Sequence, residues 1–290
     1  MPTTPDFPQD EDQRTPDIKV SFGQTEEGFL AAQVNDTAFA LLPNKQRAFT
    51  VASCSRLRGP IEEWKRSDFC SYGRAPTNED EFRAYVNEYA EHLQQLSKLH
   101  RKELSPGVST PWGGADQAIQ YAEGIISYST PSHGGFYVQP EDNAKIHPLL
   151  LRPSGWYEED CEWGAVAQAL PALFTDYEKR RADETIRHWY PDAWETIHQK
   201  TLKSGESLMH DRRQFEREHV SHWIVITALS LKYPPGMVAC LATRGGNRQS
   251  KEVRHYLIPS REYDPGRFGF VIDETKYTPC GDHIWPRPET

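Results

Sequence analysis

The chain has 290 residues, of which 37% are hydrophobic and 11% aromatic, and its formal net charge is −9. This length allows one large domain or two modest ones, and the aromatic side chains compensate for a low mean hydropathy of −0.74 by supplying large buried surfaces. The negative charge argues against a general electrostatic attraction to nucleic acid or anionic lipid, so we expect neither direct nucleic-acid binding nor membrane binding.

The cysteines and the N-terminus point to the cytoplasm. Five cysteines are spread along the chain without a CxxC pair, namely Cys54, Cys70, Cys161, Cys240 and Cys280. Such a sparse, odd set is typical of reduced thiols. The N-terminus has no basic segment followed by an apolar one, and no apolar run approaches the roughly 18 residues of a membrane span. The sequence therefore predicts a soluble cytoplasmic protein.

The first 104 residues are predicted to form a tail and a small module. Residues 1–17 are rich in Pro and Asp and are expected to be disordered. Residues 18–104 are expected to form a β-rich module with a long helix. Its four apolar runs predict an antiparallel meander, and they are Ile18–Phe22, Phe29–Val34, Thr37–Leu42 and Ala48–Ala52. The polar pair inside Val34–Thr37 favours a hairpin.

A long amphipathic helix is predicted from Thr77 to Glu103, because apolar residues recur there at helical spacing. Asn78 and the acidic residues after it supply a cap and a favourable first turn. The segment Ser105–Gly107, which reads Ser-Pro-Gly, ends this helix. It marks the predicted boundary with a second domain, residues 105–275.

The stretch Thr110–Pro171 contains the most chemically specific residues of the chain. The short apolar run Tyr121–Tyr128 predicts one strand, and Phe136–Val138, entered through two glycines, predicts another. From Trp156 onward the apolar residues recur at helical spacing as far as Pro171. The sequence Asp-Cys-Glu-Trp at Asp160–Trp163 is therefore expected on a central helix.

The last third of the chain is predicted to form helices and then an antiparallel sheet. The helices are expected at Asp176–His188, Trp194–Gln199 and Glu206–His219, and the strands at His222–Leu231, Met237–Thr243, Val253–Ile258 and Phe268–Ile272. Arg244–Arg248 (RGGNR) could cradle a phosphate, but it lacks a following helix, which favours a hairpin tip. Residues 276–290 form a Pro-rich tail. The fold class is thus α+β, with antiparallel sheets, a long amphipathic helix and a central helix.

Our leading functional hypothesis is a thiol-dependent hydrolase or acyltransferase. Cys161 near a helix start would be the nucleophile and His133 the base, with His147 or Asp142 orienting the base. Asp160 completes the candidate catalytic set. The candidate binding residues are Trp112, Ser132, Gly134, Trp156, Glu158, Glu159 and Glu162. The carboxylates around Cys161 disfavour a thiolate, so an inert structural cysteine is the alternative.

The carboxylates suggest a second chemistry. On a helix, Glu158 and Glu162 would share one face, and with His133 or His147 they could hold a hard divalent metal ion or act as an acid–base pair. The sequence has neither an HExxH motif nor the spacing of a Cys/His zinc cage, so we assign no metal ligand and expect no cofactor. A solvated acidic helix start is the alternative interpretation.

Two resemblances to protein families add to these hypotheses. The order of His133 and Cys161 resembles that of circularly permuted papain-like enzymes, including the lecithin-retinol-acyltransferase group, which implies a thiol mechanism. The chain from about Thr110 to Asp273 resembles an uncharacterised proteobacterial family found on plasmids, phages and other mobile elements. The motifs of this second match are TPWG at Thr110–Gly113, SHGG at Ser132–Gly135, GWYEEDCEW at Gly155–Trp163, WYPDAW at Trp189–Trp194 and RFGFVID at Arg267–Asp273.

The mobile-element resemblance implies a bacterial cytoplasm and an accessory role in gene transfer or in evading host defence. Together with the acidic charge, it suggests a non-enzymatic alternative. In that alternative the protein binds a basic host defence protein, such as a nuclease, and imitates DNA.

Overall fold

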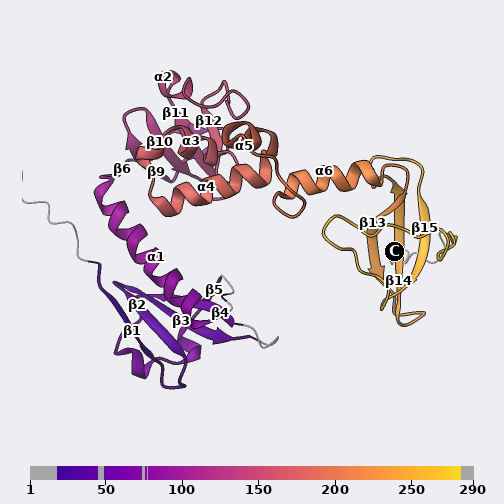
Figure 1. Ribbon diagram of the computed structural model, residues 1–290, viewed down its shortest axis with the longest axis horizontal. Helices are drawn as coiled ribbons and strands as arrows, with labels where there is room; N and C mark the ends of the chain where they lie inside the picture. Colours follow the sequence, from indigo (N-terminus) through magenta and orange to yellow (C-terminus); the bar gives the residue numbers. More distant parts are fainter. Residues whose placement is uncertain (1–17, 45–48, 74–75, 77, 282–290) are drawn as a thin grey trace, which may run out of the picture. The chain divides into compact units, whose positions relative to one another are not determined.

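The computed structural model describes residues 18–44, 49–73, 76 and 78–281. The α+β class is confirmed, and neighbouring strands within each sheet of the described residues are antiparallel (Figure 1). The chain divides into two compact units, Met1–Ile186 and Arg187–Thr290. The predicted boundary at Ser105–Gly107 lies within the first of these units. The tail predicted at residues 1–17 lies outside the described residues.

The first sheet confirms the predicted meander. Its strands follow one another in sequence order: β1 Val20–Gln24, β2 Leu30–Val34, β3 Thr37–Pro43, β4 Phe49–Ser55 and β5 Ser71–Tyr72. Val34 pairs with Thr37 across the predicted hairpin, where Asn35 adopts a left-handed conformation with φ of 48°. The two-residue β5 was not indicated by the sequence pattern.

Helix α1, Glu79–Lys98, covers one face of this sheet. Its buried residues Phe82, Val86 and Ala90 pack against Val34, Phe39 and Leu41. The helix ends five residues before the predicted Glu103, because His100 is left-handed with φ of 48° and a strand begins at Lys102. The opposite face packs against Ile61 of the short 3-10 helix η1 Ile61–Glu63, against Trp64, and against Phe69, which follows a second 3-10 helix, η2 Arg66–Asp68.

The second sheet holds the candidate site. Its spatial order is β12-β11-β10-β9-β6, and its strands are β6 Lys102–Leu104, β9 Gln117–Ala122, β10 Ile125–Ser129, β11 Gly134–Val138 and β12 Trp156–Glu158. The single strand predicted at Tyr121–Tyr128 is wrong, because the chain turns at Gly124, whose φ is 72°. The strand predicted at Phe136–Val138 is confirmed. A separate small hairpin joins β7 Ser109–Thr110 and β8 Gly113–Gly114.

Helix α3 begins later than the sequence predicts. It spans Trp163–Ala169, and Asp160, Cys161 and Glu162 lie in the turn before it. The prediction of a helix carrying this Asp-Cys-Glu segment is wrong because Trp156–Glu158 pairs with β11 as a strand. α3 packs on β11 and β12. The other helical segments here are α2 Pro140–Asn143, η3 Pro171–Leu173 and α4 Asp176–Trp189.

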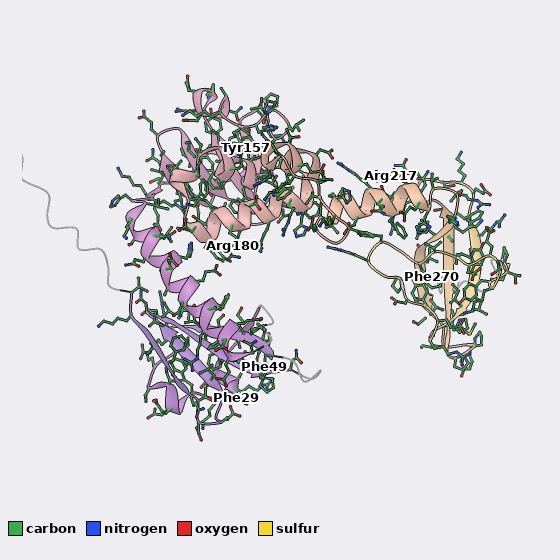
Figure 2. All side chains as sticks on the ribbon, viewed as in Figure 1. Phe29, Phe49, Tyr157, Arg180, Arg217 and Phe270 are labelled. Atoms are coloured by element: carbon green, nitrogen blue, oxygen red, sulfur yellow. The ribbon has the colours of Figure 1, made fainter. Side chains whose placement is uncertain are left out.

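The second unit contains two helices and a three-stranded sheet in the order β13-β14-β15. Its elements are α5 Pro191–His198, α6 Leu208–Glu218, β13 Trp223–Ser230, β14 Met237–Arg244 and β15 Arg254–Pro259. Trp223, Tyr256 and Ile258 are fully buried in its core, and Phe270 packs against them (Figure 2).

The C-terminal segment departs from the prediction in two places. The fourth strand predicted at Phe268–Ile272 is wrong, since only Val271 forms a bridge, with Ile224. Within the predicted tail 276–290, Cys280 bridges to His255 at the edge of the sheet, whereas residues 282–290 lie outside the described residues. Among the helices of the described chain, none has the length and apolarity needed to cross a bilayer.

Candidate functional site

His133 is fixed at the end of the loop that joins β10 to β11. The backbone N–H of His133 donates to the hydroxyl of Thr130 at 3.1 Å, and the N–H and hydroxyl of Thr130 donate to the carbonyl oxygen of His133 at 2.7 and 2.8 Å. Ser/Thr hydroxyls commonly close such turns onto their own backbone. The next residue, Gly134, pairs with Ser129 in the sheet, so the imidazole starts from a defined position at the strand end.

Glu158 and Glu159 reach the same place from β12. Glu158 is the last residue of that strand and pairs with Gly135. The N–H of Glu159 donates to the carbonyl oxygen of Gly134 at 3.1 Å. Oε2 of Glu158 accepts from the N–H of Asp160 at 2.8 Å and from that of Cys161 at 3.4 Å, which closes the turn. Oε1 of Glu158 accepts no hydrogen bond from a described residue and remains available to a ligand.

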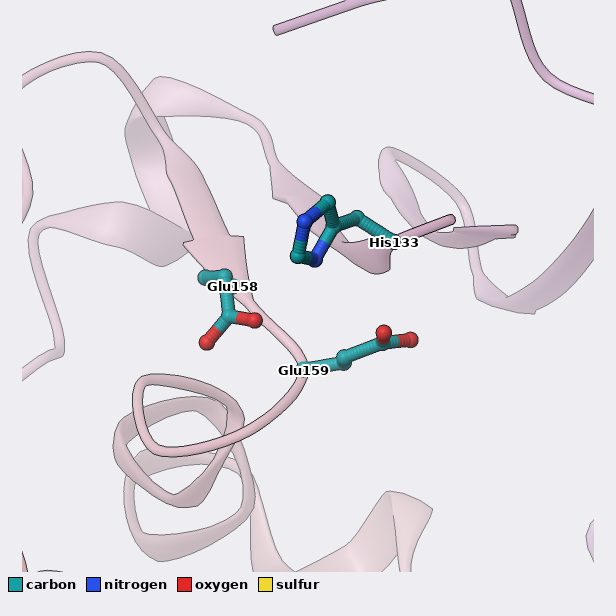
Figure 3. A group of neighbouring side chains, drawn as sticks. All are labelled: His133, Glu158 and Glu159. Atoms are coloured by element: carbon teal, nitrogen blue, oxygen red, sulfur yellow. The ribbon is translucent and has the colours of Figure 1, made fainter. Parts of the chain in front are cut away.

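These three side chains converge. One ring nitrogen of His133 and one carboxylate oxygen each from Glu158 and Glu159 lie within 4.8 Å of one another (Figure 3). His133 and Glu159 are exposed, and Glu158 is half-buried. Residue 134 must be small here, because a Cβ on Gly134 would lie 2.5 Å from Oε2 of Glu159 and 2.8 Å from the carbonyl oxygen of Tyr128. We call these residues the His133–Glu158–Glu159 cluster.

Glu162 acts on the backbone behind this cluster. Its Oε2 accepts from the N–H of Glu158 at 3.1 Å, and its Oε1 accepts from Nε of Arg152 at 2.7 Å. Both side chains of the ion pair are largely shielded, with 34% and 23% of the Arg152 and Glu162 side chains exposed. Glu162, predicted as a binding residue, therefore holds the end of β12 in place.

A buried hydrogen-bond network fixes β12 from its other side. The Tyr157 hydroxyl donates to Oδ1 of Asn143 at 2.6 Å and accepts from the N–H of Arg152 at 3.0 Å. The Asn143 side-chain amide in turn donates to the carbonyl oxygen of Arg152 at 2.9 Å. Burial raises the pKa of Tyr157, so its hydroxyl stays protonated and keeps its donor role.

Aromatic side chains lie on the same sheet face as Glu158. Trp156 is two residues before Glu158 on β12, so both point to one side of the sheet. The Trp156 ring lies 5.7 Å from that of Trp112, 5.6 Å from Tyr128 and 5.0 Å from Tyr137. A Cβ on Gly135 would lie 2.4 Å from the Trp112 ring, so glycine there lets the indole approach the sheet. The predicted binding residues Trp112 and Trp156 are thus neighbours of the cluster.

The other candidate residues are placed differently. Cys161 is half-buried in the turn, outside the cluster, with its N–H on the same Glu158 carboxylate. Ser132 and Asp160 are exposed on the two loops. His147 lies after α2, where its Nδ1 accepts from the N–H of Leu149 at 3.3 Å. Hydrogen bonds from Lys145 and Gln139 lower the pKa of Asp142, so that carboxylate is already engaged.

Sequence reasoning missed three residues that organise this site: Thr130, Arg152 and Tyr157. For Thr130 a signal was present, because a threonine three residues before a loop histidine is typical of a hydroxyl-closed turn. Arg152 gave no signal, since it meets Glu162 from an irregular segment ten residues earlier. Tyr157 is recognisable only once Trp156–Glu158 is known to be a strand.

No curated protein and no solved structure matches this chain. Residues 105–220 match the family described as a domain of unknown function, DUF7007. The matched segment contains all three members of the cluster, as well as Trp112, Trp156 and Cys161. Residues 105–220 are therefore similar to this domain of unknown function, and the candidate site lies within the matched segment.

Proposed function

We propose that this protein is a carboxylate- or metal-dependent hydrolase with the His133–Glu158–Glu159 cluster as its reaction centre. The observation that supports it is that a ring nitrogen of His133, from the loop before β11, and carboxylate oxygens of Glu158 and Glu159, from the end of β12, lie within 4.8 Å of one another. Imidazole and carboxylate together suit a divalent ion such as Mn²⁺ or Zn²⁺. Three protein ligands leave coordination positions for water and substrate, and such an ion would make that water a nucleophile near neutral pH.

The surroundings of the cluster support this chemistry. Each of the three residues is held by its backbone: His133 by Thr130, Glu158 by Glu162 and Glu159 by Gly134. These bonds fix the backbone positions from which the three side chains approach one another. The aromatic face formed by Trp112 and Trp156 beside Glu158 offers an apolar surface for the part of the substrate that does not react.

The test combines metal binding with hydrolysis by the full chain. We expect Mn²⁺ or Zn²⁺ to bind in calorimetry, and chelation to abolish hydrolysis in a panel of p-nitrophenyl esters and phosphodiesters. Glu159→Gln and His133→Ala should each weaken metal binding at least about tenfold, since even the loss of a residue that only hydrogen-bonds to a metal ligand costs that much. Glu123→Gln is the matched control, because Glu123 is exposed at the opposite end of β10. Equal metal binding by all variants, or metal-independent hydrolysis, would overturn this assignment.

A thiol mechanism is the second candidate, and one contact favours it. Cys161 donates its N–H to Glu158, whose carboxylate also belongs to the cluster with His133, so the thiol residue borders the same site. Cys161 would then be the nucleophile and His133 its base. Cys161→Ala should abolish hydrolysis while leaving metal affinity unchanged in this case, and iodoacetamide should inactivate the enzyme. Full activity of Cys161→Ala would exclude the thiol mechanism.

The setting we propose is the cytoplasm of a bacterium that carries a plasmid or phage encoding this protein, as the sequence motifs suggest. A binding role against a basic host defence protein fits the uneven charge, because residues 1–186 contain 29 Asp and Glu against 18 Lys and Arg. If this role is the working one, pull-down of a host nuclease should weaken steeply with added salt and survive the His133→Ala change. A host phenotype that disappears with His133→Ala would favour the enzyme.

A further inference from the structure

The second unit contains a cavity of about 300 Å³, which we call the α6 cavity. Residues of α6 form one wall, and residues 224–226 of β13 form another. The tip of the β14–β15 hairpin and the segment after β15 complete it, through Gly245–Arg248 and Arg267–Phe268. A volume of this size lies at the lower end of the range for small-molecule sites. It therefore fits one small molecule.

Three separate segments each bring an arginine to this cavity. Arg212 comes from α6, Arg248 from the hairpin tip and Arg267 from the segment after β15. Arg212 pairs with Glu216 at 2.9 Å. In the described part of the chain, neither Arg248 nor Arg267 has a carboxylate partner, and both are exposed. Two guanidinium groups beside one cavity without neutralising partners favour an anion, and their planar forks match a phosphate.

The net charge of the second unit does not repel an anion. Residues 187–290 contain 15 Lys and Arg against 13 Asp and Glu, a net charge of +2, whereas the chain as a whole carries −9. The first two residues of α6, Leu208 and Met209, also line the cavity, so the positive end of that helix adds to the arginines. Among the described residues that line the cavity, Glu216 is the one carboxylate, and it pairs with Arg212, so three arginines and one glutamate give the lining a net charge of +2.

Two phenylalanines and Ile224 give the cavity an apolar part that suits a flat group. Phe215 of α6 and Phe268 lie 5.8 Å apart with an angle of 43° between their planes, and both are half-buried. The guanidinium of Arg267 lies 5.7 Å from the Phe268 ring centroid, which places a charge beside an aromatic surface. Ile224, buried in β13, also lines the cavity, and a Cβ on Gly246 would lie 3.5 Å from it. That distance is ordinary van der Waals contact, and it is the left-handed backbone at Gly246, with φ of 70°, that favours glycine at the hairpin tip.

We propose that the α6 cavity binds a nucleoside monophosphate. Arg248 and Arg267 hold its phosphate, and Phe215 and Phe268 contact its base. The cavity volume limits the ligand to one nucleotide, which is either free or the terminal nucleotide of a strand. Aromatic contacts to bases tolerate any sequence, so the site distinguishes phosphate from nucleoside more strongly than one base from another.

Calorimetry on the full chain tests this with AMP, GMP, adenosine, inorganic phosphate and a 5′-phosphorylated oligonucleotide. We expect AMP and GMP to bind more tightly than adenosine or phosphate alone, and binding to weaken with added salt. Arg248→Gln and Arg267→Gln should each lower AMP affinity about tenfold or more, since a hydrogen bond to a charged group is removed. Phe268→Leu should lower AMP affinity and leave phosphate affinity unchanged.

Arg217→Gln is the matched control, because Arg217 is exposed on the same helix but does not line the cavity (Figure 2). It should bind AMP as the unmodified protein does. Equal affinity for AMP and the 5′-phosphorylated oligonucleotide would assign the site to free nucleotides, and tighter binding of the oligonucleotide would assign it to strand ends. Absence of AMP binding, or equal loss in Arg217→Gln and Arg248→Gln, would overturn the site.

Discussion

At Glu178, burial and hydrogen bonding act on one carboxyl in opposite directions. Burial alone would raise its pKa, but a forked pair of hydrogen bonds from Arg101, at 2.8 and 2.7 Å, and one from the Thr175 backbone lower the pKa overall. Only 12% and 17% of the Arg101 and Glu178 side chains are exposed. Nearby, burial lowers the pKa of His92, whose Nδ1 lies 2.8 Å from the Thr175 hydroxyl. These residues join α1 to the start of α4.

These shifts predict a loss of stability in acid. Because the folded state holds the pKa of His92 below its ordinary 6.5, the unfolded state binds the proton first. The contribution of His92 to the free energy of unfolding is complete above a pH of about 6.5 and declines below it. The contribution of Glu178 declines only as the pH falls below the ordinary pKa of that carboxyl, 4.5. When unfolding by urea is measured at several pH values, His92→Gln should reduce the fall in the free energy of unfolding between about pH 7 and pH 5. His100→Asn, at an exposed histidine, should leave it intact, and an unchanged slope in His92→Gln would refute this explanation.

The Tyr157 hydroxyl joins Asn143 and Arg152 in the buried hydrogen-bond network beside the His133–Glu158–Glu159 cluster. Tyr157→Phe leaves Oδ1 of buried Asn143 and the N–H of Arg152 without their present partner. A buried polar group left unpaired costs about 1–3 kcal/mol, so we expect a lower free energy of unfolding by that amount. Tyr128→Phe on β10 should be near neutral, because no described residue hydrogen-bonds to that hydroxyl. Equal effects of the two changes would contradict the role of the network.

At the scale of elements, hydrophobic periodicity predicted those helices and strands whose formation depends on the local sequence pattern. The meander, the long α1 helix and the C-terminal helices follow from apolar spacing. The start of α3 did not, because Trp163, Val166 and Leu170 have helical spacing while Trp156–Glu158 is held as a strand by β11. Long-range pairing overrides local propensity at such positions. Tyr121–Tyr128 is divided for a different, local reason, since the chain turns at Gly124 and the two halves pair with each other.

The candidate site was predictable only in part. Trp112, His133, Trp156, Glu158 and Glu159 were singled out, and the sheet register brings them to one edge. The spacing of Glu158 and Glu162 suggested a shared helical face, yet Glu158 ends a strand and Glu162 binds its backbone. The Glu158 carboxylate closes the turn around Cys161 by accepting from two backbone N–H groups. This contact depends on the backbone conformation, so the residue types alone did not predict it.

The sheet of the second unit contains a residue whose replacement should stabilise the fold. Thr243 on β14 is fully buried, and its hydroxyl has no hydrogen-bond partner in the described part of the chain. Thr243→Val removes an unsatisfied polar group with little change of shape, so we expect a gain of about 1 kcal/mol in the free energy of unfolding. Thr227→Val at an exposed position on β13 is the control. Destabilisation by Thr243→Val would show that the hydroxyl has a partner.

At the scale of the whole molecule, charge and chemistry are divided between the two units. The excess of acidic residues and the His133–Glu158–Glu159 cluster belong to residues 1–186, whereas the arginines of the α6 cavity belong to residues 187–290. We expect the two sites to be separable. His133→Ala should keep its AMP affinity, and Arg248→Gln should keep its metal affinity, both measured by calorimetry on the full chain. A loss of both affinities in either variant would show that the sites are coupled.

The most direct measurement is anomalous diffraction from crystals of the full chain grown with Mn²⁺. An ion held by the cluster would give a peak between the His133 imidazole and the carboxylates of Glu158 and Glu159, because these three ligand atoms lie within 4.8 Å of one another. Crystals of Glu159→Gln should lack the peak, and those of Glu123→Gln should retain it. Peaks only elsewhere on the protein, or a peak that persists in Glu159→Gln, would contradict a metal-dependent reaction centre at this cluster.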